Sequence, residues 1–417
     1  MDRIVILADD FTGAADTGVH FACRGLRTAV VFDRRVIPAA FDSCRVLALS
    51  TETRYMTPED AARTVFDLAS HCSQAGGTFF FKKIDSAMRG NPGHETAALL
   101  KRLAMRAALV CPALPASGRS VVDGILLVDG RPVHETELGR DIFTPVETSG
   151  VADLFASQSG LRAGRLTLAD LERGKEYLIR KVRVLLDDGC GAIVPDAVTD
   201  RHMETLADLL LYFQEPDDGL PRLLPVGSAG LGKALAAALA EPVIRETIRP
   251  HGRLLAVVGS LNASALEQMR YGVESGRFVH LPFSVEAALD DPERECGRLL
   301  RALPRGGHVI LHGESMEDAA AITTGSGADV AEAYGALVSG VCRHAPFTSV
   351  YATGGNIAMS VARHLGLGSL ELEEELLPGV ALSSCFSRET DVRWFISKAG
   401  SFGNKNTLAA IADTLNR

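Results

Sequence analysis

Short apolar runs, turns rich in Gly, Asp or Ser, and longer amphipathic stretches follow one another along the whole chain. Residues 3–8 are Arg-Ile-Val-Ile-Leu-Ala, a turn with two acids and a glycine follows, and 13–24 carries apolar residues at helical spacing. Such alternation indicates βα units, which assemble into mainly parallel sheets covered by helices. The pattern therefore predicts an α/β fold.

A few segments need separate interpretation. The apolar run 182–185 predicts a further buried strand, and 125–128 with 132–134 flank Asp-Gly-Arg and indicate a β-hairpin. The acidic run Glu371–Glu375 is typical of a solvated helical face.

The length implies more than one domain, because 417 residues exceed the roughly 250–300 at which a single core stops growing. Residues 241–252 hold two prolines and mixed charges without periodicity, and a new strand–helix series starts at 254. We therefore expect two α/β domains, 1–245 and 250–417, with mainly parallel sheets and an active-site cleft between them.

Composition disfavours several partners. The net charge is −9 with no block of Lys or Arg, which argues against nucleic acid, and no window has the roughly 18 apolar residues of a membrane helix. The eight cysteines lie more than twenty residues apart, which excludes CxxC metal sites and predicts small core residues. Acids directly after the first short apolar run argue against a targeting segment, so we expect a cytoplasmic protein.

Two carboxylates, Asp9 and Asp10, leave the carboxyl end of the first predicted strand. Ligands bind at this edge in open α/β sheets, and paired acids there can accept a hydroxyl proton or hold Mg²⁺. The alternative is that Asp10 or Thr12 only caps the following helix.

A second charged group, Lys82-Lys83-Ile84-Asp85, lies at another strand end, with Arg89 four residues further on. Two lysines that end an apolar strand are costly to bury without anions, so a ligand carboxylate or phosphate is a natural partner. Arg54 follows a third predicted strand and can join them. The alternative is a solvated loop.

Glycine-rich turns follow several later strands. The segment Gly227–Ala234 fits GxxxxGK, but Ala234 stands where a P-loop needs Ser or Thr, which favours a glycine-rich helix start that serves packing or the ligand of the other domain. Three loops after 254 each place small residues before a helix, and their N–H groups would suit a phosphate-rich ligand. These loops contain Ser260, Gly354-Gly355-Asn356-Ile357 and Gly400. The alternative is three ordinary tight turns.

Five motifs taken in order carry a resemblance: Ala-Asp-Asp-Phe-Thr-Gly, Lys-Lys-Ile-Asp-Ser-x-x-Arg-Gly-Asn, Gly-Ser-Leu-Asn, Thr-Gly-Gly-Asn and Lys-Ala-Gly-Ser-Phe-Gly. Together they resemble the four-carbon acid sugar kinases, which use ATP to phosphorylate threonate, erythronate or 3-oxo-tetronate at O4. The resemblance covers essentially the whole chain. Small departures, Ala87-Met88 and Ser401, remove no charged group.

The resemblance implies a sugar-acid-binding N-terminal domain and a nucleotide-binding C-terminal domain, with ATP and Mg²⁺ as cofactors. It implies substrate-binding positions at Asp9, Arg54, Lys82, Lys83, Ile84 and Asp85. It implies nucleotide-binding positions at Ser260, Gly354, Gly355, Asn356, Ile357 and Gly400. The continuation Asp16-Thr17-Gly18 is more similar to the threonate and erythronate kinases than to the 3-oxo-tetronate kinases.

We therefore expect a D-threonate 4-kinase in which Arg54, Lys82 and Lys83 hold the substrate carboxylate. Asp9, Asp10 or Asp85 would accept the O4 proton. The alternatives are a D-erythronate or 3-oxo-tetronate kinase and a non-catalytic sugar-acid-binding protein. An NAD(P)-dependent dehydrogenase is disfavoured because no GxGxxG turn follows a strand. A homo-oligomer is compatible with the sequence, which specifies neither the oligomeric state, nor the substrate stereochemistry, nor the Mg²⁺ ligands.

Overall fold

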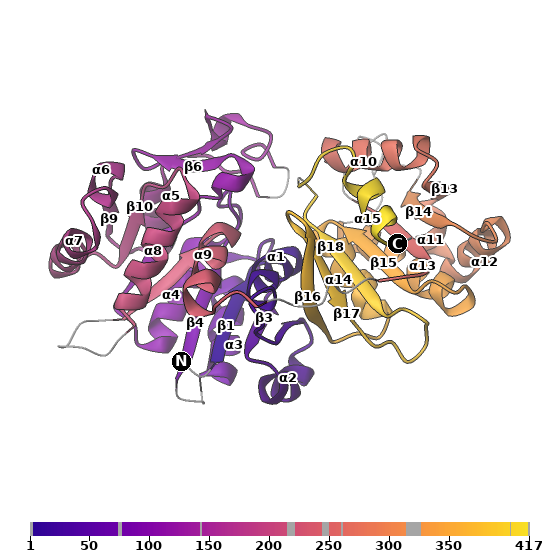
Figure 1. The fold of residues 1–417 in the computed structure, drawn as a ribbon, viewed down its shortest axis with the longest axis horizontal. Coiled ribbons are helices and arrows are strands. Elements are labelled where there is room, and N and C mark those ends of the chain that lie inside the picture. Colours follow the sequence, from indigo (N-terminus) through magenta and orange to yellow (C-terminus); the bar gives the residue numbers. More distant parts are fainter. Residues whose placement is uncertain are drawn as a thin grey trace. The chain divides into compact units, whose positions relative to one another are not determined.

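The computed structural model describes residues 3–73, 77–141, 144–214, 222–243, 250–259, 262–313, 327–400 and 402–415. The chain forms two units, each with its own sheet and helices (Figure 1). The first contains Met1–Leu26 and Arg45–Val243, and the second contains Arg27–Cys44 and Ile244–Arg417. The α/β fold predicted from the sequence is confirmed.

The first unit is built on a parallel seven-stranded sheet. Its order is β3 (Val46–Ser50), β1 (Arg3–Ala8), β4 (Thr78–Lys83), β11 (Leu223–Gly227), β5 (Ala107–Cys111), β10 (Ala192–Pro195) and β9 (Ala163–Leu166). Strands β1, β5 and β10 are almost wholly buried, as expected of parallel strands covered by helices.

The helices of the first unit pack in two groups. One contains α1 (Phe11–Ala22), α9 (Ala229–Leu239) and α8 (Asp200–Tyr212), and the other contains α3 (Pro58–Cys72), α4 (Pro92–Leu103) and α5 (Val151–Ser159). Two further helices are α6 (Leu168–Leu171) and α7 (Lys175–Asp187). The predicted strand at 182–185 is wrong, because these residues lie in α7, where only one face is buried.

A small antiparallel sheet belongs to the same unit. It contains β6 (Arg119–Val122), β7 (Ile125–Val128) and β8 (Arg131–Pro132). Val128 pairs with Arg131 across Asp129-Gly130, which confirms the predicted hairpin, although its second strand is Arg131–Pro132 and Val133–Glu135 form a 3₁₀ turn.

The second unit has a mixed eight-stranded sheet. Its order is β13 (Phe278–Phe283), β14 (His308–Gly313), β12 (Leu254–Val258), β15 (Ser349–Thr353), β18 (Trp394–Lys398), β17 (Val380–Ser384), β16 (Ser369–Leu377) and β2 (Thr28–Val31). The first five strands are parallel, and the last three join by antiparallel pairing. Its helices are α2 (Ile37–Ser43), α10 (Ala263–Glu274), α11 (Val285–Asp290), α12 (Pro292–Ala302), α13 (Gly327–His344), α14 (Gly355–His364) and α15 (Thr407–Leu415).

Strand β16 differs from the sequence expectation. The acidic run Glu371–Glu375 is part of this strand and not of a helix. Leu370 and Leu372 are buried, while Glu371 between them and Glu373 after them are partly exposed, which is the period of two that a strand requires. The prediction of a helix was based on the run of acidic residues and overlooked this short alternation of buried and exposed side chains.

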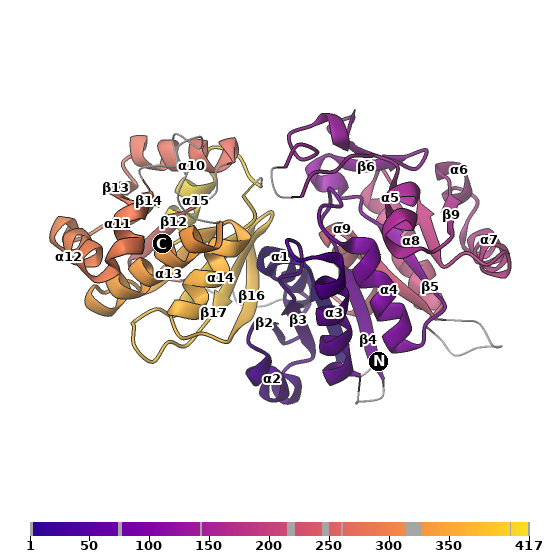
Figure 2. The same cartoon turned by 180° about the vertical axis from the view of Figure 1, so that it is seen from behind.

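Strand β2 comes from the N-terminal part of the chain but completes the second sheet (Figure 2). Val31 to Thr28 pair antiparallel with Ser369 to Leu372, and Arg27 makes a bidentate ion pair with Glu371 at 2.7 and 3.1 Å. The predicted ranges 1–245 and 250–417 assign this segment to the N-terminal domain. The structure differs because pairing with β16 places Arg27–Cys44 in the second unit.

Six of the eight cysteines are buried or nearly so in the cores, whereas Cys23 is exposed and Cys385 is half-buried. Among the described residues, no helix combines the length and the apolar character that crossing a membrane requires.

Candidate active site

Three neighbouring strand ends bring the charged residues of the first unit together. Ala8, the last residue of β1, pairs with Ser50 of β3 on one side and with Lys83 of β4 on the other. Asp9 therefore leaves the sheet between the segments that carry Arg54 and Asp85. This edge is where open α/β sheets bind ligands.

Arg54 organises the acids at this edge. Its Nε donates to Asp9 Oδ2 at 2.7 Å, and one terminal nitrogen donates to Asp10 Oδ2 at 2.8 Å. The other terminal nitrogen lies 3.8 Å from Asp85 Oδ1. Because the guanidinium is buried and engaged by two carboxylates, its first role in this structure is to hold the acids together.

Asp10 also begins helix α1. Its Oδ1 accepts the Gly13 N–H at 2.8 Å, and its Oδ2 accepts the Thr12 hydroxyl at 2.9 Å as well as Arg54. A Cβ at Gly13 would lie 2.6 Å from Asp10 Oδ1 and 2.9 Å from Lys83 Nζ, so this turn requires glycine. The helix-cap interpretation of Asp10 is thus correct, and the same carboxylate also belongs to the charged cluster.

Asp85 is held by a residue that the sequence analysis quoted without assigning it a role. Arg89 donates to Asp85 from Nε at 2.8 Å and from a terminal nitrogen at 3.0 Å, and its other terminal nitrogen lies 3.1 Å from Asp141. Both oxygens of Asp85 are therefore occupied. The i,i+4 spacing of Asp85 and Arg89 was the available signal, whereas nothing local pointed to Asp141.

Lys82 lies beneath the cluster with a partner that the sequence analysis missed. Its Nζ is 2.7 Å from Glu95 Oε2 and donates to the Leu7 and Lys83 carbonyls. Both side chains are almost fully excluded from solvent, at 0% and 1% exposure. Glu95 lies in α4, and no local motif links it to Lys82. Direct contact of Lys82 with a substrate is not favoured by this burial.

Lys83 is placed differently. Its Nζ donates to the Ile84 carbonyl at 2.9 Å and lies against the start of α1, beside Asp10. Ile84 itself is buried, and its N–H donates to Gly227 O. An ammonium at this edge is suited to a ligand carboxylate.

Opposite charges control the ionisation of the acids. Burial alone would raise the pKa of Asp9, but Arg54, Lys83 and Lys82 outweigh it and lower the pKa below its usual value. Burial likewise opposes ionisation of Asp85, yet Arg89 and Arg54 lower its pKa strongly. Both groups are carboxylates at neutral pH. Asp9 Oδ1 is buried without a hydrogen-bond partner among the described residues, unlike the oxygens of Asp10 and Asp85.

The predicted phosphate loops lie in the second unit. Thr353 at the end of β15 pairs with Lys398 at the end of β18, so Gly354 and Gly400 leave neighbouring strands at one edge. Gly354 has a φ of 97°, and no side chain caps α14, leaving the N–H groups at Gly355 and Asn356 suited to phosphate. A Cβ at Gly259 would lie 2.5 Å from Ile357 Cγ1, so this loop is close to α14. Ser260 lies outside the described residues.

The segment Gly227–Ala234, which resembles a P-loop in sequence, has a packing role. A Cβ at Gly227 would lie 2.6 Å from Cys111 O, and one at Gly232 would lie 2.5 Å from Thr17 Cγ2. Ser228 caps α9 and donates to Ala113 O. The side chain of Lys233 is 58% exposed and is 4.0 Å from Asp200. This segment joins α9 to its neighbours.

Lys233→Ala is therefore expected to leave the KM for ATP near the wild-type value, because the ammonium faces solvent and is screened. Steady-state kinetics with varied ATP measures this. A large loss of ATP affinity would instead restore the P-loop interpretation.

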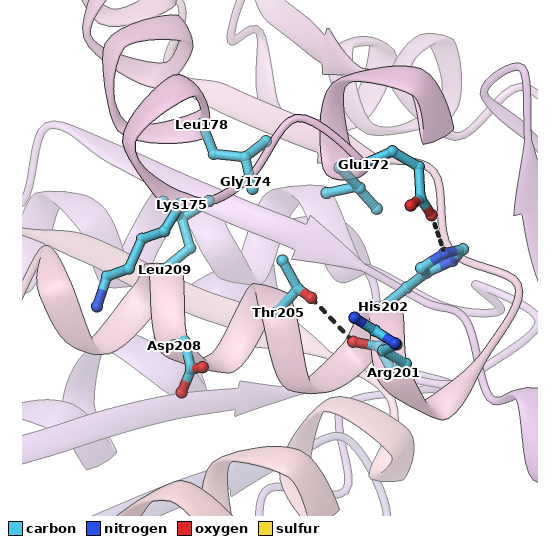
Figure 3. Close-up of a pocket in the computed structure, with 10 residues that line it drawn as sticks. Glu172, Gly174, Lys175, Leu178, Arg201, His202, Thr205, Asp208 and Leu209 are labelled. Atoms are coloured by element: carbon cyan, nitrogen blue, oxygen red, sulfur yellow. Dashed lines mark hydrogen bonds and ion pairs between the residues drawn. The ribbon is translucent and has the colours of Figure 1, made fainter.

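A separate hollow of about 260 Å³ lies among α6, α7 and α8 (Figure 3). Glu172 and His202 face each other there, with carboxylate and ring nitrogen 3.5 Å apart. Lys175, Arg201 and Asp208 also line it, and the hollow includes none of the predicted site residues.

Comparison with known proteins agrees with this division. Residues 4–235 match the family described as a sugar-binding N-terminal domain, and residues 255–408 match a nucleotide-binding C-terminal domain. The D-threonate kinase of Salmonella typhimurium is 30% identical over 97% of this chain and 96% of its own length. The D-erythronate kinase of Heliobacterium modesticaldum is 28% identical over 100% and 97%.

A solved structure from Salmonella typhimurium LT2 has the same fold, with a TM-score of 0.80, 22% identity and 98% coverage of both chains. Fold and matches together define a two-domain α/β protein that joins a sugar-binding domain to a nucleotide-binding domain. The chain belongs to the family of four-carbon acid sugar kinases.

Proposed function

We propose that this protein transfers the γ-phosphoryl group of ATP to the 4-hydroxyl of a four-carbon sugar acid, with D-threonate as the preferred acceptor. Its full-length similarity to D-threonate kinases supports the acceptor. One observation carries the chemistry: an ionised carboxylate, Asp9, presents a buried oxygen without a partner at the ligand-binding edge of the sugar-binding domain. We propose a cytoplasmic location, and this proposal is compatible with a homo-oligomer.

The first unit would bind the sugar acid and remove the proton of its 4-hydroxyl. Lys83 would attract its carboxylate, while Asp9 Oδ1 would accept the O4 proton as the hydroxyl attacks phosphorus. Arg54 would keep Asp9 and Asp10 in place, and Arg89 would do the same for Asp85. Lys82 would act on Asp9 from beneath through its positive charge.

The second unit would bind ATP. Gly354 would form the turn before α14, and the N–H groups at Gly355, Asn356 and Ile357 would contact the phosphates, together with the loops of Ser260 and Gly400. Mg²⁺ would enter with ATP and neutralise phosphate charge, since it is usually held by phosphates and one or two carboxylates. Because Asp9 Oδ1 acts as the base in this proposal, the phosphates of ATP would themselves hold the Mg²⁺.

An acceptor panel tests the proposal. Purified protein with Mg²⁺ and ATP is assayed for ADP release with D-threonate, D-erythronate, L-threonate and 3-oxo-tetronates, and phosphorus NMR locates the new ester. We expect the highest kcat/KM with D-threonate and the phosphate on O4. Higher kcat/KM with another acid would make the protein the erythronate or 3-oxo-tetronate kinase. Binding of a sugar acid without ADP release would make it a non-catalytic binding protein.

A further inference from the structure

Lys398, at the end of β18, is a buried cation that the proposed mechanism does not use. The residue is 1% exposed, and among the described residues no carboxylate lies within ion-pair distance of its ammonium. Burial lowers its pKa to about 7. A methionine would fill similar space without the cost of burying a charge. The lysine is therefore expected to have a role beyond packing.

The ammonium instead gathers backbone carbonyls. Nζ donates to Ala399 O at 2.8 Å, to Phe402 O at 2.9 Å and to Gly400 O at 3.2 Å. An ammonium has three donors, so all of them are used within four residues of the following turn. Gln268 from α10 donates to the same Phe402 carbonyl at 2.9 Å.

Because the ammonium binds the carbonyls of this turn, the N–H groups of the turn are available to other partners. No described residue accepts a hydrogen bond from the Gly400 N–H. The Lys398 carbonyl accepts the Gly354 N–H at 3.4 Å, which links the same residue to the start of α14. Lys398 thus contacts both glycine turns at this edge.

We infer that Lys398 is a positioning residue of the nucleotide site, whose ammonium fixes the Ala399–Gly400 turn so that its N–H groups face the phosphates of a nucleoside di- or triphosphate. The inference rests on the proposed function, because it assigns the phosphates to this edge. An anion that binds there would in turn favour the protonated, positively charged form of this lysine.

Lys398→Met in the full-length protein tests the inference. Isothermal titration with MgADP should give a Kd at least about tenfold above wild type, since charge-assisted hydrogen bonds contribute about 1.5–3 kcal/mol and tenfold corresponds to 1.4. KM for ATP should rise in parallel, while KM for the sugar acid stays close to wild type. A general loss of structure would not produce this split between the two substrates.

Lys405→Met is the matched control, because Lys405 is an exposed lysine of the same segment that lies over the Tyr271 ring. It removes the same charge and should leave the ADP Kd near wild type. Equal weakening by both variants would reduce the effect to net charge and overturn the inference. An unchanged Kd for Lys398→Met would also overturn it.

Gln268→Leu keeps the test decisive if Lys398→Met does not fold. It removes the second donor to Phe402 O and should weaken ADP several-fold, by about 1 kcal/mol, without a change in sugar-acid KM. Unchanged ADP binding in this variant would contradict the inference. Absence of ADP binding by wild-type protein would refute the proposed function itself, whereas binding by wild type with no effect in the variants would refute only the role of Lys398.

Discussion

Asp9→Asn is expected to lower kcat for sugar-acid phosphorylation by about 10²–10⁴-fold, the usual contribution of a general base. Asparagine keeps the size of the side chain and can accept hydrogen bonds from Arg54, but it cannot take the O4 proton. ADP binding should remain unchanged, because the proposed nucleotide residues lie in the other unit. Steady-state kinetics and isothermal titration with MgADP measure the two effects.

Three further variants sharpen this test. Asp10→Asn and Asp85→Asn should lose less kcat, since both oxygens of each carboxylate already accept hydrogen bonds. Asp200→Asn, whose side chain is 59% exposed in the same unit, removes an equal charge and should have no effect. Wild-type kcat in Asp9→Asn with a large loss in Asp85→Asn would move the base to Asp85. Wild-type kcat in all of them would remove the N-terminal carboxylates from the chemistry.

The pH profile should agree with this assignment. Because the pKa of Asp9 is lowered from 3.8, the carboxylate stays deprotonated down to pH values below its ordinary pKa. Activity that depends on Asp9 is therefore fully present above about pH 5 and is lost only as pH falls through the lowered pKa. A profile of kcat/KM that falls with an apparent pKa near 6 would indicate a different base.

Glu95→Leu is expected to lower the free energy of unfolding of the first unit by about 3–5 kcal/mol, because it leaves the Lys82 ammonium buried without its counter-ion. The double variant Lys82→Met/Glu95→Leu should be much closer to wild type, since two apolar side chains replace the pair. This non-additivity is the signature of a buried ion pair. Similar losses in the single and the double variant would show that packing, not charge, explains the effect.

The measurement must distinguish the two units. The single tryptophan, Trp394, lies in β18 of the second unit, so its fluorescence does not report directly on the first. Urea unfolding is therefore followed by far-UV circular dichroism, with Trp394 fluorescence recorded in parallel. We expect the fluorescence transition to move less than the dichroism transition. The sugar-acid KM of the double variant should stay near wild type if Lys82 does not contact the substrate.

The meeting of Asp9, Arg54 and Asp85 was predictable from sequence because each follows a strand of a parallel sheet, and parallel strands end at one edge. The partners were less predictable. Glu95 reaches Lys82 from α4, and Asp141 reaches Arg89 from a loop fifty-two residues away, so no local spacing encodes either contact. Local patterns predict from which strand end a side chain projects, whereas the pairing of charged side chains depends on tertiary packing.

Two secondary-structure predictions were wrong for related reasons. Residues 182–185 are apolar enough for a strand, but the surrounding helix buries only Val182 among them. In Glu371–Glu375 the acidic residues suggested a solvated helix, although the flanking leucines alternate with a period of two. Both segments are short, and a window of four or five residues cannot separate the two periods.

The assignment of β2 to the second unit has a consequence for biosynthesis. Arg27 cannot form its ion pair until Glu371, which lies 344 residues later, has been synthesised. At about 5–20 residues per second, a ribosome needs roughly 17–70 s for that stretch. Throughout that interval the N-terminal strand has no β16 with which to pair, even after the last residue of the first unit has been made. Without β16, the edge of β2 that pairs with it is open and favours misassembly, so nascent chains are expected to need protection at Thr28–Val31. If the N-terminal half of the gene were expressed alone, Thr28–Val31 would never gain β16 as a partner.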